Sequence, residues 1–486
     1  MKSENPKSTL IRGAFWTVGT RWAIKLVGFI NTVIMARLIL PSDYGVVAMA
    51  TLLVGLIQAF TDIGAETAIM RMKSPSTDDI DSAWTLRLIQ SMVVGMLMMG
   101  IAPLAALYFN EPRVQKVIWV IAVLMAINGT TNIGLTLAQK KFNFSLFFRV
   151  NVYSKIVSVA ATLISGYILR DYRALVIGIG SGYLTSVALS YIMHPYRPRW
   201  NTKKIKEIWN ITKWLMVTSI GTFLLRRSDE ILAARIAGTA EYGSYHVGAD
   251  LGKLPVSELG PAMMRAFLPI LSSLQEDTKR VNAAVLKTLS AVNVLTMPIG
   301  FGVAAIALPL TTLVLGEKWT NAAPFVAIFA IISTIQFIAS PLITLLILNG
   351  YTKIQSTAIW IEFALFIVAA YFLFSYFDLI GLAIARLLAS LLSTGLMLYF
   401  SQKYCFMSIR KMLFSILRPM VGAIIMGAGV YYYIQNIYDF KYIIIPLVII
   451  SSAIFYIFWC LITWLIIGKP EGLESTVLDS YKLKFK

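Results

Sequence analysis

Long apolar segments follow one another along almost the whole of this chain, and they restrict its fold more than any other feature. A helix needs about 20 mainly apolar residues to cross a bilayer, and short polar connections separate fourteen segments of that size. The sequence therefore predicts an all-α polytopic membrane protein with about 14 transmembrane helices. Their approximate limits are 13–38, 44–70, 83–108, 115–139, 149–169, 173–193, 211–235, 241–271, 283–314, 320–348, 353–376, 378–402, 412–434 and 441–467.

The composition excludes a soluble domain and indicates an orientation. Hydrophobic residues make up 58% of the 486 residues and charged residues only 14%, whereas soluble domains are roughly 45–50% apolar. A net charge of +19 would suit a nucleic-acid partner, but Lys and Arg lie in short connections rather than in a basic domain. An even number of spans places both termini on the face with the more basic connections, which predicts cytoplasmic N- and C-termini.

One short motif occurs twice. Residues 36–45 read ARLILPSDYG, and residues 234–243 read ARIAGTAEYG, at an offset of 198 residues (234 minus 36). Ala, Arg, an aliphatic residue, an acid, Tyr and Gly recur at identical spacing. The sequence therefore predicts two related halves, as in many transporters with a central substrate path. The alternative is a chance turn signal in an apolar chain.

The repeat predicts a division of the chain into domains. An N-terminal lobe covers 1–193 and a C-terminal lobe covers 211–402, each with six predicted helices. The most basic connection, 194–210, would be a cytoplasmic linker, either solvated near anionic lipids or in contact with headgroups or a partner. Two further helices follow at 403–467, and residues 468–486 would form a cytoplasmic tail.

Charged residues inside the predicted helices are the candidates for function, because such residues are costly in a membrane and normally face a bundle interior or a wet cavity. Most lie in the four helices that flank the two motif copies, which predicts a hydrated cavity between the lobes. Structural ion pairs and side chains that reach the membrane surface are the alternatives. The predicted cavity cations are Arg21, Lys25, Arg226, Arg227 and Lys253, and the candidates for coupling to a cation or proton are Asp62, Glu66, His246 and Asp250.

Nothing in the sequence indicates covalent catalysis. The chain has no glycine-rich phosphate loop, HExxH or CxxC motif, and its two cysteines and two histidines are widely spaced. We therefore predict no catalytic residue, no metal and no cofactor, and a transporter rather than an enzyme. A membrane glycosyltransferase or polymerase is the alternative from another class. Such an enzyme usually displays carboxylates on a sizeable loop, whereas the predicted periplasmic loops are as short as 110–113 and 170–173.

Several motifs, in this order along the chain, resemble those of the polysaccharide transporter family. These proteins are the Wzx-type lipid-linked oligosaccharide flippases of the multidrug/oligosaccharidyl-lipid/polysaccharide exporter (MOP) superfamily. The motifs are Gly13-Ala14-Phe15-Trp16, Ala36-Arg37-Leu38 with Pro41-Ser42-Asp43-Tyr44-Gly45, Gln139-Lys140-Lys141-Phe142-Asn143-Phe144, Phe267-Leu268-Pro269 with Gln275-Glu276-Asp277, and Leu315-Gly316-Glu317-Lys318-Trp319.

The resemblance implies two six-helix bundles, alternating access and a cavity that is cationic in lipid flippases, with a groove for the lipid tail at two extra helices. The expected function is translocation of an undecaprenyl-pyrophosphate-linked oligosaccharide across the bacterial inner membrane, for exopolysaccharide, capsule or O-antigen lipopolysaccharide synthesis. Expected partners are this lipid, membrane lipids, a polysaccharide polymerase and glycosyltransferases, and no nucleic acid. A cation-coupled multidrug exporter of the same superfamily is the nearest alternative.

Overall fold

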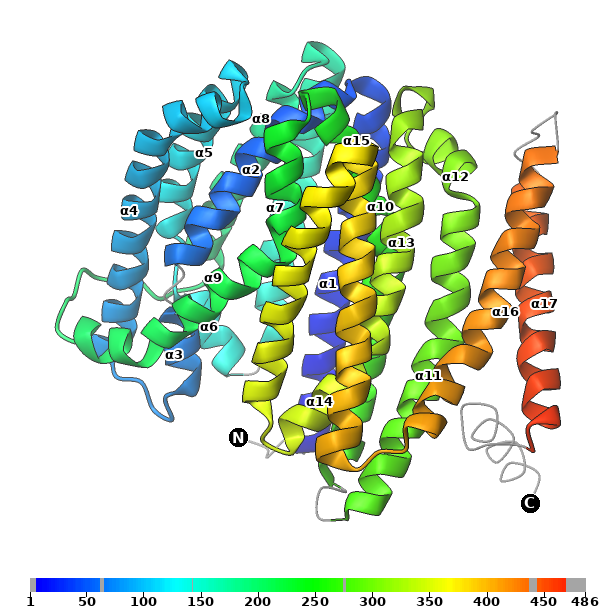
Figure 1. The fold of residues 1–486 in the computed structure, drawn as a ribbon. Helices are drawn as coiled ribbons and strands as arrows, with labels where there is room; N and C mark the ends of the chain where they lie inside the picture. The colour runs from blue at the N-terminus through cyan, green and yellow to red at the C-terminus, as the bar shows by residue number, and fades with distance from the viewer. Residues whose placement is uncertain (1–5, 62–64, 142, 274–276, 437–443, 469–486) are drawn as a thin grey trace. The chain divides into compact units, whose positions relative to one another are not determined.

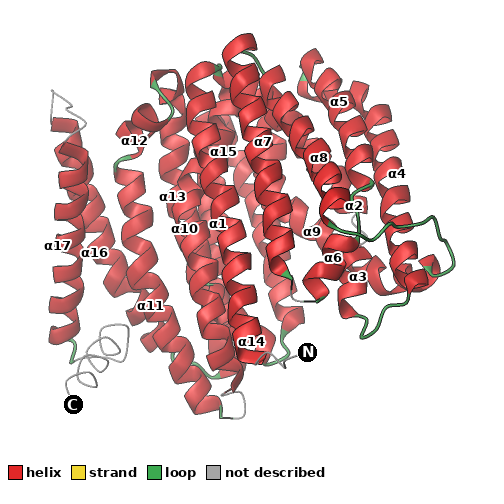
Figure 2. Cartoon of the chain, turned by 180° about the vertical axis from the view of Figure 1, so that it is seen from behind, coloured by secondary structure: helices red, strands yellow, loops and turns green. Residues whose placement is uncertain are grey.

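The computed structural model describes residues 6–61, 65–141, 143–273, 277–436 and 444–468. Throughout these ranges the chain forms helices and connecting loops, and no strand occurs in them (Figures 1 and 2). Contacts divide the chain into two compact units, Met1–Gly243 (unit 1) and Ser244–Lys486 (unit 2). Each unit is described by itself below.

In unit 1, long helices alternate with two short ones. α1 packs on α7, α7 on α8, α4 on α5, and α2 on α9, and Figure 1 shows α4 and α5 side by side. The helix that follows, α10 (Thr239–Ser273), begins in unit 1 and continues into unit 2. The helices of unit 1 are α1 (Pro6–Leu38), α2 (Pro41–Thr61), α3 (Ala65–Arg71), α4 (Thr77–Phe109), α5 (Pro112–Gly129), α6 (Gly134–Lys140), α7 (Phe144–Leu169), α8 (Arg173–Met193) and α9 (Ile205–Ile236).

The turn between α4 and α5 shows how the sequence ends one membrane helix and starts the next. Asn110 ends α4 in the left-handed conformation (φ 54°), which Asn tolerates better than most residues. The Glu111 side chain accepts a hydrogen bond from the backbone N–H of Arg113, and Pro112 occupies the first turn of α5. A hydrogen bond from the Arg113 guanidinium holds the pKa of the Glu111 carboxyl below its usual range.

The predicted linker, 194–210, lies against α4. The Tyr196 hydroxyl donates to Asp81 Oδ1 (2.7 Å), Asn201 Nδ2 donates to Asp78 Oδ1 (2.8 Å), and the Lys204 N–H donates to Ser82 Oγ (3.2 Å). α9 begins at Ile205, so the non-helical connection is 194–204. Side-chain hydrogen bonds therefore hold this connection in one conformation.

The two copies of the repeated motif meet within unit 1. A Cβ atom at Gly45 would lie 1.9 Å from the Thr239 carbonyl oxygen, and a Cβ atom at Gly243 would lie 2.0 Å from the Pro41 carbonyl oxygen. Pro41 and Thr239 are equivalent positions of the repeat, as are Gly45 and Gly243. Each glycine thus allows the backbone of the other copy to approach closely. The contact is reciprocal, because equivalent residues of the two copies make equivalent approaches.

Unit 2 continues the pattern of long helices. α11 packs on α13 and α16, α13 on α15, and α16 on α17, and Figure 2 shows α16 and α17 side by side. Its core includes Leu289, Leu345 and Met412, all fully buried. After α10 its elements are α11 (Thr278–Ala305), α12 (Ala307–Val314), the 3-10 helix η1 (Glu317–Ala322), α13 (Ala323–Ile338), α14 (Ser340–Leu348), α15 (Thr352–Cys405), α16 (Ile409–Asn436) and α17 (Ile444–Ile466).

α15 is two helices joined at a sharp bend. Asp378 interrupts it with a non-helical backbone (φ 49°, ψ −133°), and the Cβ of an alanine at Gly381 would lie 2.1 Å from the Leu373 carbonyl oxygen. The two passes are therefore 352–377 and 379–405. They correspond to the predicted spans 353–376 and 378–402.

The described residues contain nine helices that are long and apolar enough to cross a membrane, or ten if the bent pair α5 and α6 is one span. The prediction of an all-α, multi-pass membrane protein is confirmed, whereas the predicted number of fourteen is not. α1, α9 and α10 are not among these nine, and α15 counts once although it makes two passes. The predicted domain limits stay a prediction.

Candidate functional site

Three basic residues of unit 1 lie on α1 and α7, two helices that pack on each other. Arg21 and Lys25 of α1 are exposed and half-buried respectively, and Gly28 follows on the same helix face. Lys155 of α7 lies over Gly28, where a Cβ atom would be 3.7 Å from the Lys155 Nζ. Arg21, Lys25 and Lys155 are called the α1–α7 cationic face below.

Lys155 is a residue that the sequence analysis missed. It is half-buried, and among the described residues none forms a hydrogen bond or ion pair with its ammonium group. The signal was present, since Lys155 lies in the interior of the predicted span 149–169, where a charge marks function by default. Gly28 makes room for the lysine side chain against α1.

The predicted charges of α9 are arranged differently. Arg227 Nη1 contacts both carboxylate oxygens of Glu230, at 2.5 and 2.6 Å, and Glu230 is fully buried, as is Asp229. Arg226 is exposed. Of the two predicted cations of α9, Arg227 is therefore neutralised by its own helix, and Arg226 carries an exposed charge.

The predicted residues of α10 lie in unit 2. The Lys253 Nζ stands 4.3 Å from the centre of the Phe329 ring, a cation–π contact with α13. His246 Nε2 is 3.9 Å from Asp250 Oδ2 one turn later, and the Asp250 side chain is 62% exposed. This spacing is longer than a hydrogen bond, so the two side chains are neighbours that a small movement could join.

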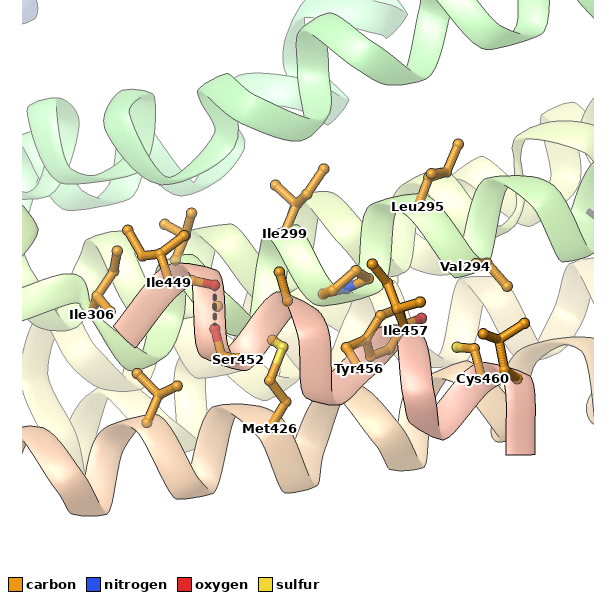
Figure 3. A pocket seen from close by; sticks show the side chains of 16 residues that line it. Val294, Leu295, Ile299, Ile306, Met426, Ile449, Ser452, Tyr456, Ile457 and Cys460 are labelled. Atoms are coloured by element: carbon orange, nitrogen blue, oxygen red, sulfur yellow. Dashed lines mark hydrogen bonds between the residues drawn. The ribbon is translucent and has the colours of Figure 1, made fainter. Parts of the chain in front are cut away.

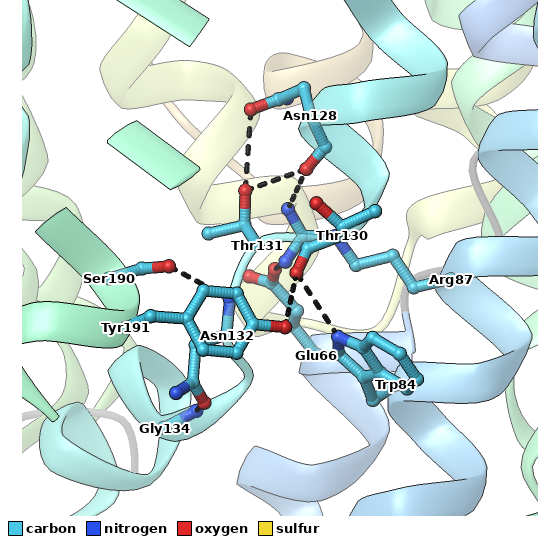
Figure 4. Close-up of polar contacts among 10 residues, drawn as sticks. All are labelled: Glu66, Trp84, Arg87, Asn128, Thr130, Thr131, Asn132, Gly134, Ser190 and Tyr191. Atoms are coloured by element: carbon cyan, nitrogen blue, oxygen red, sulfur yellow. Dashed lines mark hydrogen bonds and ion pairs between the residues drawn. The ribbon is translucent and has the colours of Figure 1, made fainter. Parts of the chain in front are cut away.

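Glu66, a predicted coupling residue, is part of an ion pair near a broken helix. Its Oε1 lies 2.6 Å from Arg87 Nη1 of α4, and Arg87 Nη2 also donates to the Asn128 carbonyl (3.4 Å) at the end of α5 (Figure 4). Asp62, the residue predicted with it, lies outside the described residues. Glu66 therefore serves to fix Arg87 against the last turn of α5.

The predicted fourth span, 115–139, is broken into α5 and α6, which meet at 57°. The Thr130 carbonyl accepts hydrogen bonds from the Tyr191 hydroxyl (2.8 Å) and Trp84 Nε1 (3.4 Å), and the Asn132 N–H donates to Ser190 Oγ (3.0 Å) (Figure 4). Side chains thus satisfy backbone groups that the break releases, as a membrane interior requires.

The last two helices of unit 2 form an apolar groove with α11. It encloses about 940 Å³ between α11, α16 and α17 (Figure 3). Pro298 and Gly302 of α11, Met426 of α16 and Ile449 and Ile457 of α17 are among the residues that line it. Such a space suits an apolar chain and offers almost nothing to a charged group.

A second groove, of about 560 Å³, lies between α16 and α17. Apolar residues such as Leu413, Phe414 and Trp459 line it together with Arg410 and Arg418. Among the described residues, no three His, Cys, Asp or Glu side chains come together to hold a metal ion.

Comparison with known proteins matches residues 34–324 to a family described as polysaccharide biosynthesis protein. The chain is similar to the lipopolysaccharide biosynthesis protein WzxC of Escherichia coli, with 21% identity over 79% of each chain.

Among solved structures, the chain is similar to the lipid II flippase MurJ in an inward closed conformation, with a TM-score of 0.70 and 14% identity over 93% of this chain and 99% of MurJ. It is also similar to an inward-facing multidrug resistance MATE family transporter of the MOP superfamily, with a TM-score of 0.59 and 13% identity over 80% and 96% of the two chains. These likenesses show the fold.

Proposed function

We propose, since this chain belongs to the polysaccharide biosynthesis protein family of the MOP superfamily, that it flips an undecaprenyl-pyrophosphate-linked oligosaccharide from the cytoplasmic to the periplasmic leaflet. The family is one of membrane transport proteins, and no enzyme activity is indicated. Its bacterial relatives indicate the inner membrane. The identity of the lipid-linked substrate and the cytoplasmic position of both termini are parts of the proposal.

The α1–α7 cationic face would hold the pyrophosphate. Charge-assisted hydrogen bonds to phosphate are stronger than neutral ones, and they strengthen where water is partly excluded. Lys155 is the observation that carries this assignment, because no described residue neutralises it beside Gly28. Arg226 and Lys253 remain proposed contributors, with Arg227 already engaged by Glu230.

The groove between α11, α16 and α17 would take part of the polyprenyl tail. The tail is a hydrocarbon, and a groove of about 940 Å³ lined by aliphatic side chains offers it apolar contact. The smaller groove places Arg410 and Arg418 beside apolar residues. That combination suits a chain with an anionic end.

Export of the glycan tests the proposal. In a strain that lacks the native protein, complementation by Lys155→Gln, Arg21→Gln and Lys25→Gln is compared with wild type, with membrane abundance measured for each. A charged hydrogen bond contributes about 1.5–3 kcal/mol, so each loss should weaken headgroup binding by roughly ten- to a hundredfold.

Lys203→Gln is the matched control. Lys203 has the same charge but is 74% exposed on the connection before α9, where solvent and salt screen it. Its variant should export normally. Normal export by the three cationic-face variants together with failure of Lys203→Gln would contradict the assignment and point to the connection instead.

A further inference from the structure

An ion pair that no sequence motif pointed to lies inside α15 of unit 2. Glu362 on the first pass and Arg386 on the second are buried, with 11% and 7% of their side chains exposed. Glu362 is ten residues after Thr352, and Arg386 is eight residues after Asp378. At a rise of 1.5 Å per residue, Glu362 is about 15 Å from the start of its pass and Arg386 about 12 Å from the start of its own. Both distances are close to half the thickness of a hydrocarbon core, which is about 30 Å.

The pair is incompletely bonded. Arg386 Nη2 and Glu362 Oε1 are 3.7 Å apart, beyond hydrogen-bond distance. The guanidinium lies over the Phe366 ring at 5.6 Å, and its buried Nη1 has no hydrogen-bond partner among the residues that the structure describes. A contact of this kind does not offset the free energy lost when two charges are removed from water. The pair therefore does not owe its presence to a gain in stability.

The described helices that pack most closely against α15 are α13, α14 and α16, and α13 and α14 contain no ionisable residue. Lys253 of α10 lies on the Phe329 ring of α13. α16 carries its basic residues Arg410, Lys411 and Arg418 in its first ten positions, next to the end of α15. The other charges of α15 are Lys353 and Lys403 near its ends and Asp378 at its bend.

Three buried hydroxyl groups lie between Arg386 and the end of α15. Ser390, Thr394 and Ser401 follow Arg386 on one helix face and are 1%, 8% and 0% exposed. Ser390 Oγ accepts a hydrogen bond from Gln336 Nε2 (3.0 Å), and Thr394 Oγ1 lies 3.2 Å from the Ile335 carbonyl. Ser401 Oγ has no partner among the described residues.

We propose that Glu362 is the site at which this protein binds and releases a proton, with Arg386 as its counter-charge and the Ser390–Thr394–Ser401 row as its access route. The proton adds to a Glu362 carboxylate oxygen and gives a neutral carboxyl group. The attraction to Arg386 then ends, and the guanidinium can turn toward the hydroxyl row. Release of the proton restores the pair, and the coupling of this cycle to transport rests on the proposed flippase function.

The proton site is tested without a substrate. Infrared difference spectra of the purified full-length protein in lipid nanodiscs, recorded between neutral and acid pH, report the C=O stretch of newly protonated carboxyl groups. We expect Glu362→Gln to lose one such band that Glu66→Gln keeps. The variant with both Glu362→Gln and Arg386→Gln removes both charges, so it guards against misfolding and should also lack the band. A full set of bands in Glu362→Gln would overturn the proposal.

Flipping in proteoliposomes tests the coupling. With a lipid-linked oligosaccharide as probe, an inward proton gradient should accelerate wild type at least about tenfold and leave Glu362→Gln unchanged, and Ser401→Ala should respond more slowly. Gradient-independent flipping by wild type would overturn the coupling role. Absence of flipping under every condition would contradict the proposed function instead, and the infrared result would still decide whether Glu362 binds a proton.

Discussion

Two arginine–glutamate pairs that link separate helical passes, Arg87–Glu66 in unit 1 and Arg386–Glu362 in unit 2, are built differently. In unit 1, Arg87 is 2.6 Å from Glu66 and also contacts the Asn128 carbonyl, and 53% of the Glu66 side chain is exposed. In unit 2, Arg386 is 3.7 Å from a Glu362 that is almost completely buried. The first pair completes a hydrogen-bond network, whereas the second leaves a buried donor unused.

The difference separates two uses of charge in a membrane protein. The Arg87–Glu66 pair beside a broken helix has a structural role, because Arg87 also donates to the Asn128 carbonyl at the end of α5. A deep, loosely bonded pair is costly, because two charges are removed from water without hydrogen bonds that compensate them. Variants of the two pairs should therefore differ in size and kind of effect.

The largest effect is expected for Arg386→Leu. It leaves the Glu362 carboxylate buried without a counter-charge, which costs about 3–5 kcal/mol. Thermal unfolding of the purified protein, followed by fluorescence-detected size exclusion, measures the loss. The variant with both Arg386→Leu and Glu362→Leu should recover most of the stability, and a single variant as stable as wild type would refute the view that the pair is desolvated.

Arg87→Gln should have a smaller effect, of about 1–2 kcal/mol. It removes two hydrogen bonds from a charged donor, but the exposed side of Glu66 lets water take over part of the loss. The same unfolding assay measures it, with Glu66→Gln as the milder companion because the Asn128 contact survives. A loss as large as that of Arg386→Leu would erase the contrast between the two pairs.

The sequence predicted those features of the fold that depend on residues close together along the chain. Apolar length alone indicated a multi-pass helical protein, and the residues Asn110, Glu111 and Pro112 indicate the turn between α4 and α5. The motif copies that end at Gly45 and Gly243 directed attention to two positions that meet in space. The break in the predicted span 115–139 was missed, although it falls at the local run 128–132, Asn-Gly-Thr-Thr-Asn. The α4 and α8 side chains that bind its backbone groups are far away in the sequence.

The residues of the candidate site also differ in whether the sequence alone could identify them. Arg21 and Lys25 are recognisable because they share one face of one helix, whereas Lys155 gains its meaning only when α7 packs on Gly28. Arg227 was predicted as a cavity cation, and Glu230, three residues later on the same helix, binds it, a spacing that the sequence already shows. Glu362 and Arg386 are 24 residues apart on one element, and only the bend at Asp378 brings them together.

The smallest expected effect is a dependence of stability on pH that comes from His194. It also tests whether the break between α5 and α6 has only a structural role. The His194 imidazole is close to Gly134, at the start of α6, and its Nδ1 accepts a hydrogen bond from the Tyr196 N–H (3.1 Å). Partial burial, with Lys141 and Arg197 nearby, lowers the pKa of His194. The folded state thus favours the neutral ring, so this stabilisation is complete above the usual pKa of about 6.5 and is lost as pH falls through the lowered value.

Unfolding measured between about pH 7.5 and pH 5 should therefore show a modest loss of stability in wild type that is reduced in His194→Asn. Asn offers the Tyr196 N–H an acceptor oxygen but does not titrate in this range. If the break between α5 and α6 has only a structural role, flipping by His194→Asn should still respond to a proton gradient, whereas flipping by Glu362→Gln should not. Loss of that response in His194→Asn would place proton coupling at the break between α5 and α6, in unit 1 rather than in unit 2.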